Sequence, residues 1–277
     1  MLQCLRLVHE FGALRALTIA YAMFPDRAQK AASAAAKRVV FNVHKLKHIE
    51  GAIQSDSRRY YALTLKGARV LHSFDDTYRV RSTTSALTFH RHEHREWCNI
   101  VALSARHRGL HSVSEAQIVG AAHSEIVHSF GHVPDALTYF SDDTGKRVAW
   151  HEVELSRRST SGKKKLAHLV QTLIEKRYLT HANDEHVIDL VMHCATDKIE
   201  RENRQVIRDA LARWADNVEE LDEDGDAVYA AQVGSGAARR WFLVYIDRLP
   251  ETVEGAWTSS LPWPGAPCAP QVDQENP

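Results

Sequence analysis

The chain has 277 residues with equal numbers of basic and acidic side chains, 35 of each, so its formal net charge is zero. This length predicts two domains, and a hydrophobic content of 44% is ordinary for a globular protein in water. No stretch approaches the roughly 18 apolar residues of a membrane span, and the first residues lack the basic segment and apolar run of a secretion signal. Four widely separated cysteines without a CxxC pair argue against a disulfide framework, so we expect a cytoplasmic protein that does not bind membranes.

Positive charge is concentrated in the N-terminal part of the chain. Residues 1–74 contain twelve Lys or Arg and four Asp or Glu, a net charge of +8. The rest of the chain has 23 basic and 31 acidic residues, a net charge of −8. A basic segment joined to an acidic one is typical of a protein whose basic end binds a polyanion.

The basic segment has a recognisable order of elements. Apolar spacing predicts helices over residues 2–16, 18–24 and 28–48. The polar turn 55–58 then separates two short strands of a β-hairpin, and Thr64 caps a helix over 65–73. This order resembles a winged helix-turn-helix, and the run from Tyr60 to Arg69 is similar to the wing strand and following helix of bacterial winged-helix regulators.

The third predicted helix has the side chains that a DNA-recognition helix needs. Six Lys or Arg lie between Arg27 and Ile49, and no acidic residue does. Helical spacing places the valines at 39, 40 and 43 and Leu46 inward, with cations and an amide on a common flank. Cations contact phosphates and amides contact base edges, so we expect binding to double-stranded DNA through Lys37, Arg38, Asn42, His44, Lys45 and Lys47, with Arg58 and Arg59 in the wing. The alternative is an ordinary solvated helix.

The remaining chain predicts an α/β domain over residues 76–249, which makes the whole fold α/β (α+β overall). After a polar linker to Ser85, the expected helices are 87–105, 113–128, 165–176 and 197–214, and the expected strands are 135–140, 147–155, 187–194 and 241–246. Ser114 is the expected cap of the second helix. Residues 250–277 contain six of the eight prolines, so we expect a flexible or loosely docked tail.

Three carboxylates fall on the predicted hairpin of this domain. Asp135 follows Pro134, and Glu152-Val153-Glu154 lies on the next strand. The pattern resembles the core of the PD-(D/E)xK nucleases, which implies a restriction-endonuclease-like fold with Mg²⁺ held by Asp135 and Glu152. Glu154 stands where that family has its lysine, so an active nuclease would have to recruit another cation, such as Lys165. The alternative is a solvated strand edge, with no cofactor.

Together, the winged helix and the segment from His132 to Lys165 resemble the replication-relaxation family of plasmids and conjugative elements. The resemblance implies a regulator or accessory factor of a mobile element, acting in replication, mobilisation or transcription control with other proteins of the element. We expect a homodimer, because dimers match palindromic half-sites. Two alternatives stay open: a Mg²⁺-dependent DNA endonuclease, and a protein-interaction factor in relaxosome assembly.

A histidine cluster precedes the domain's carboxylates. His90, His92 and His94 would share one face of a strand, whereas on a helix His90 and His94, and likewise His94 and Cys98, are one turn apart. Either arrangement would supply some of the ligands of a zinc site. Because the chain has 17 histidines, a chance cluster at a hydrated helix start is the alternative.

Overall fold

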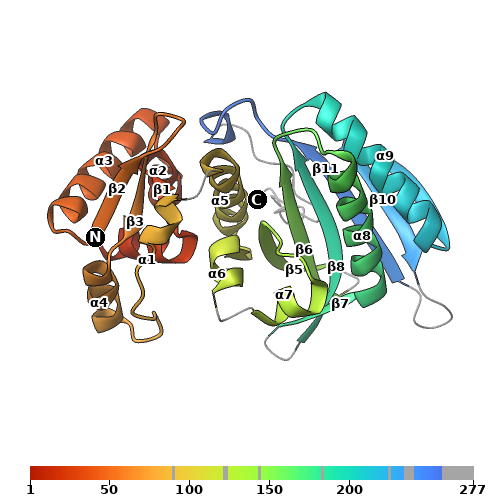
Figure 1. Ribbon diagram of the computed structural model, residues 1–277, viewed down its shortest axis with the longest axis horizontal. Coiled ribbons are helices and arrows are strands. Elements are labelled where there is room, and N and C mark those ends of the chain that lie inside the picture. The colour runs from red at the N-terminus through yellow and green to blue at the C-terminus, as the bar shows by residue number, and fades with distance from the viewer. Residues whose placement is uncertain are drawn as a thin grey trace, which may run out of the picture.

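A computed structural model describes residues 1–88, 91–120, 124–142, 145–181, 184–223, 226–233 and 240–257. In these residues the chain is a mixed α/β protein with two β-sheets. The smaller sheet and its helices lie on one side of α5 (His92–His107), and the larger sheet lies on the other (Figure 1).

The N-terminal elements surround a three-stranded sheet. They are α1 (Leu2–Phe11), β1 (Ala13–Arg15), α2 (Ala16–Met23), α3 (Gln29–Lys45), β2 (Ile49–Ile53), β3 (Arg59–Leu63) and α4 (Leu65–Phe74). Both β1 and β2 pair with β3 in antiparallel register. The expected hairpin is confirmed, and the Thr64 side chain caps α4 by accepting a hydrogen bond from the Gly67 N–H.

The first predicted helix is too long. It ends at Phe11, because Gly12 has a φ of +79°, a left-handed conformation that glycine adopts without strain and that stops a helix. The next three residues form β1, which the helical pattern concealed.

The larger sheet has the strand order β4-β5-β6-β8-β11-β10-β9, and β7 pairs beside β8. Its central pairs β6–β8 and β8–β11 are parallel, and the others are antiparallel. The elements after α5 are β4 (His111–Ser114), α6 (Glu115–Val119), α7 (Ser124–Phe130), β5 (Ala136–Asp142), β6 (Gly145–Glu154), α8 (Thr160–Lys176), β7 (Tyr178–His181), β8 (Asp184–Cys194), α9 (Asp197–Trp214), β9 (Asn217–Glu223), β10 (Asp226–Val233) and β11 (Arg240–Arg248). Short 3-10 helices occur at Thr84–Thr88 and Gly255–Trp257.

Helices cover both faces of this sheet (Figure 1). On one face, Val148 and Trp150 of β6 belong to the same core as the apolar sides of α8 and α9. On the other face, Ala149 of the same strand packs against Ala105 of α5. Alternate residues of β6 therefore point to different layers.

Two expectations for this domain are wrong. The helix expected over 113–128 is split, because Val113 pairs with Leu137 in β4 and the chain then forms two short helices. Ser114 does cap, in a capping box with Gln117, but it caps α6. The strands β7, β9 and β10 were not expected, since their sequences lack a clear apolar alternation and pairing with neighbouring strands decides them.

The apolar core runs from the N-terminal unit into α5. One cluster of buried side chains contains residues of α1, α2, α3 and α4 together with Trp97, Ile100 and Val101 of α5. Val253 and Ala256 are buried in the same cluster, so the expectation of a loose tail is wrong for residues 250–257. Residues 258–277 lie outside the described part of the chain. None of the helices in the described segments combines the length and the apolar character needed to span a bilayer.

Candidate functional site

The outer face of α3 is cationic and exposed. This helix lies at the edge of the molecule farthest from the larger sheet (Figure 1). The alanines and valines of its inner side are buried, so the opposite side is in solvent. All six DNA-binding residues expected here are exposed: Lys37, Arg38, Asn42, His44, Lys45 and Lys47.

Two apolar side chains near this face depart from the sequence analysis. Phe41, which the sequence analysis did not single out, is 66% exposed between the cations. Leu46 was expected to face inward but is 47% exposed, because it follows the last helical turn.

A groove of about 470 Å³ lies between α3, the start of α2 and the β2–β3 hairpin. Its wall carries four cationic side chains and one carboxylate: Arg15, Lys37, Arg58, Arg59 and Glu254. A concave surface with an excess of cations concentrates the field that attracts an anionic chain.

The two arginines expected in the wing have different surroundings. Arg59 begins β3 and is exposed. The Arg58 guanidinium instead lies 3.8 Å from the Glu96 carboxylate of α5 and 4.0 Å from Asp56. Arg58 therefore belongs partly to the junction between the hairpin and α5, and Arg59 is the more available cation.

A larger cavity, of about 730 Å³, opens where β5 begins and β6 ends. Asp135, Glu152 and Glu154 all line it, so the structure brings together the three carboxylates singled out in the sequence. The hairpin turn contributes Ser55 and Asp56 to the opposite wall. Lys165 is exposed on α8 and is not part of this wall.

Asp135 is directed toward α5. Its Oδ2 accepts a hydrogen bond of 2.7 Å from the Val153 N–H and lies 3.5 Å from Nε2 of His94. The Asp135 N–H donates to the His151 carbonyl, which extends the β5–β6 ladder by one residue.

Glu152 has other hydrogen-bond partners, Trp150 and His132. Its Oε1 accepts hydrogen bonds from the Trp150 indole at 2.9 Å and from His132 at 3.0 Å. The hydrogen bond to Glu152 raises the pKa of His132. The neighbouring Arg158 pairs with Glu154, and its Nη2 is 3.9 Å from Glu152. Burial raises the pKa of Glu154 despite this pairing.

These three carboxylates do not fit a Mg²⁺ site. In the described segments, the side chains that bring three metal-ligating atoms within 4.8 Å of one another are His94, Cys98 and Asp135, and not the three carboxylates. Glu152 is held by the Trp150 indole and by His132, whereas the Asp135 carboxylate is held by the Val153 N–H and lies against His94 of α5. Mg²⁺ prefers an octahedron of oxygen atoms, and a set with imidazole and thiol does not match it.

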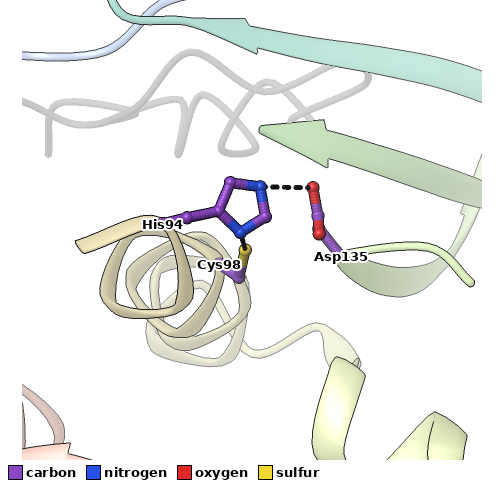
Figure 2. Close-up of side chains that lie close together, drawn as sticks. All are labelled: His94, Cys98 and Asp135. Atoms are coloured by element: carbon purple, nitrogen blue, oxygen red, sulfur yellow. Dashed lines mark hydrogen bonds and ion pairs between the residues drawn. The ribbon is translucent and has the colours of Figure 1, made fainter. Parts of the chain in front are cut away.

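His94 lies between Cys98 and Asp135 (Figure 2). Its Nδ1 is 3.4 Å from the Cys98 sulfur, and its Nε2 is 3.0 Å from the Val153 carbonyl oxygen. Burial lowers the pKa of His94, but the hydrogen bond and charge of Asp135 outweigh it and raise that pKa to about 9. Burial raises the pKa of the Cys98 thiol.

His92 and His94 lie on the helix α5 and not on a strand. His92 is buried against the Tyr60 ring, with ring centroids 4.8 Å apart. His90 lies outside the described residues. His94 and Cys98, expected one helical turn apart, do contact each other. Asp135, just before β5, contacts the other ring nitrogen of His94.

Sequence analysis missed His132 and Arg158 as neighbours of the carboxylates. Arg158 follows Glu154 by four residues, a spacing that carries no signal at the end of a strand. His132 meets Glu152 only because the chain before β5 returns to the end of β6.

The chain matches no protein-family model, no curated protein and no solved structure. Its function must therefore be inferred from its own surface and cavities. These are the cationic surface around α3 and the polar cavity at the ends of β5 and β6.

Proposed function

We propose that the protein binds double-stranded DNA sequence-specifically, with α3 as the recognition helix of a winged helix. The observation that carries this proposal is the exposed, acid-free face of α3, where Lys37, Arg38 and Lys45 surround Asn42. Such a face matches the major groove, because cations contact the phosphates on its rims and an amide can bond an adenine edge.

The N-terminal topology supports the winged-helix assignment. Three helices and a strand precede a β-hairpin, and β3 is the central strand of the sheet. The cationic groove beside α3 lies where a wing and a recognition helix would hold the same duplex, and Arg59 supplies the exposed wing cation.

The second domain supports an accessory role in a mobile element, as the replication-relaxation resemblance implies. The order β4-β5-β6-β8, with two antiparallel pairs followed by a parallel one, is compatible with a restriction-endonuclease-like core. In this proposal that domain is a platform for homodimerisation and for other proteins of the element. Two copies would place two α3 helices on a palindromic site.

The test is binding of the full chain to labelled duplexes, measured by fluorescence anisotropy. A preferred site is first selected by pulling down genomic fragments. Affinity should fall steeply between about 50 and 200 mM salt, with a log–log slope of about −0.9 per neutralised phosphate. Replacing Lys37, Arg38 and Lys45 by Ala should weaken binding to every duplex and flatten this slope. Asn42→Ala should also reduce the preference for the selected site, by ~1–3 kcal/mol.

The control removes three exposed cations elsewhere, Lys164, Lys198 and Arg213 on α8 and α9. It should bind as the unaltered protein does. If both triple variants lost the same DNA affinity, binding would depend on total positive charge and not on α3, and the proposal would fail. A protein that binds no DNA but captures other proteins of the element would favour the relaxosome alternative.

A further inference from the structure

Two side chains at the wall of the larger cavity, His94 and Asp135, and one buried behind it, Cys98, present a nitrogen, an oxygen and a sulfur atom to one another. His94 and Cys98 are one turn apart on α5, and Asp135 precedes β5 (Figure 2). One ligating atom from each residue lies within 4.8 Å of the other two. Tetrahedral zinc with bonds of about 2.0–2.3 Å holds its ligands roughly 3.3–3.8 Å apart, so a modest contraction would form a site.

The hydrogen bonds around His94 direct one ring nitrogen toward the cluster. Nε2–H donates to the Val153 carbonyl at 3.0 Å, so Nδ1, which faces Cys98, is the ring nitrogen that a cation would bind, displacing its proton. A backbone carbonyl that fixes the tautomer in this way is a recurrent partner of metal-bound histidines.

Asp135 also keeps an oxygen atom for a metal. Its Oδ2 is held by the Val153 N–H, so Val153 orients both His94 and Asp135 through its two backbone groups. Val153 lies near the end of β6, where it pairs with His193 of β8, so the sheet holds its backbone in place.

A cysteine nucleophile is a weaker explanation of the same three residues. Cys98 is 1% exposed and is not part of the cavity wall, so a substrate could not reach its sulfur. An ion is small enough to lie among the three side chains, since His94 and Asp135 both reach the wall.

We propose that His94, Cys98 and Asp135 bind a thiophilic divalent cation, zinc, with the fourth position open to the cavity. The mixed nitrogen, sulfur and oxygen set selects zinc over magnesium. The site is independent of the DNA-binding face of α3.

The experiment titrates Co²⁺, a spectroscopic substitute for zinc, into the full chain after treatment with a chelator. The expected result is one equivalent of Co²⁺ with a thiolate-to-cobalt charge-transfer band, displaced by one equivalent of Zn²⁺ and not by millimolar Mg²⁺. Native mass spectrometry supplies the stoichiometry. Cys98→Ser should remove the band and weaken binding by more than about 100-fold, beyond the effect of losing a supporting residue.

Cys194→Ser is the matched control. Cys194 is as buried as Cys98, but it lies at the end of β8, where its sulfur contacts Asn203 of α9. It should keep the band. Asp135→Asn preserves side-chain size and should weaken Co²⁺ binding at least tenfold, and this variant decides the matter if circular dichroism shows that Cys98→Ser does not fold. Absence of the band in the unaltered protein, its persistence in Cys98→Ser, or unchanged affinity in Asp135→Asn would overturn the proposal.

Discussion

Two buried histidines on neighbouring parallel strands make the native state sensitive to acid. His151 and His193 are fully buried, and their Nδ1 and Nε2 atoms are 3.0 Å apart. Burial lowers the pKa of both, that of His193 to about 4. One neutral ring donates to the other, and protonating both would place like charges in contact without water.

The sign of the pH dependence follows from this depression. The unfolded chain takes up protons near the ordinary histidine pKa of about 6.5, and the native pair does not. Stability is therefore lost as pH falls below about 6.5 toward 4, by up to about 1.4 kcal/mol per pH unit for each histidine. Urea denaturation of His193→Gln should show a shallower loss than the unaltered chain. The exposed His168→Gln should show the original slope, and equal slopes in all three proteins would contradict this account.

At the scale of elements, the packing of α4 depends on a missing side chain. A Cβ on Gly67 would lie 2.1 Å from the His48 carbonyl oxygen, far inside contact distance. Gly67 also donates its N–H to the Thr64 cap, so the first turn of α4 cannot move away without losing that bond.

Gly67→Ala should therefore lower the free energy of unfolding by about 2–4 kcal/mol, even though alanine favours helices by about 1 kcal/mol. Thermal unfolding checks this. Ser73→Ala, at an exposed position of the same helix, should change stability by less than about 1 kcal/mol. A Gly67→Ala protein as stable as the original would mean that α4 does not approach His48 this closely.

At the scale of the whole molecule, Glu96 joins the N-terminal unit to α5. Its carboxylate is 2% exposed, 2.8 Å from Arg15 and 2.9 Å from the Thr18 hydroxyl that donates to it. The Tyr60 hydroxyl and Arg58 also lie close to it, so one carboxylate holds β1, α2 and the hairpin against α5.

Glu96→Gln should cost about 2–4 kcal/mol, because it removes the close, buried anion of the largely buried Arg15 and leaves only the exposed Glu254 at 3.9 Å. The exposed Glu93→Gln on the same helix should have little effect. Chemical denaturation measures both. A silent Glu96→Gln would show that apolar contacts alone join the two units.

The carboxylate cavity should not cleave DNA with Mg²⁺ or Mn²⁺. Asp135 and Glu152 are held by different hydrogen-bond partners, and Glu154 adds a third carboxylate to a cavity where cations would be needed to stabilise the developing phosphate charge. The pure protein should leave supercoiled and linear DNA intact. Cleavage that disappears in both Asp135→Ala and Glu152→Ala would establish a nuclease, whereas cleavage that survives both would indicate a contaminant.

The sequence by itself determined the local elements whose signals lie within a few residues. The Ala-rich run predicts α3, the turn 55–58 predicts the hairpin, and Thr64 predicts the start of α4. These depend on apolar spacing and on caps, which act over one or two turns. The exposed cations of α3 were predictable for the same reason, because a helix with one apolar side must present the other to solvent.

Only the tertiary structure decided how distant residues meet. The acidic strand β9 forms because β10 pairs with it. Gly12 ends α1, although the apolar residues on both sides of it fit a longer helix. The sequence placed Asp135 near Glu152 on adjacent strands, but the Val153 N–H and His94 of α5 hold the Asp135 carboxylate, and Trp150 and His132 hold Glu152. Such choices depend on which face of a strand is covered by which helix, and that is a property of the packed layers.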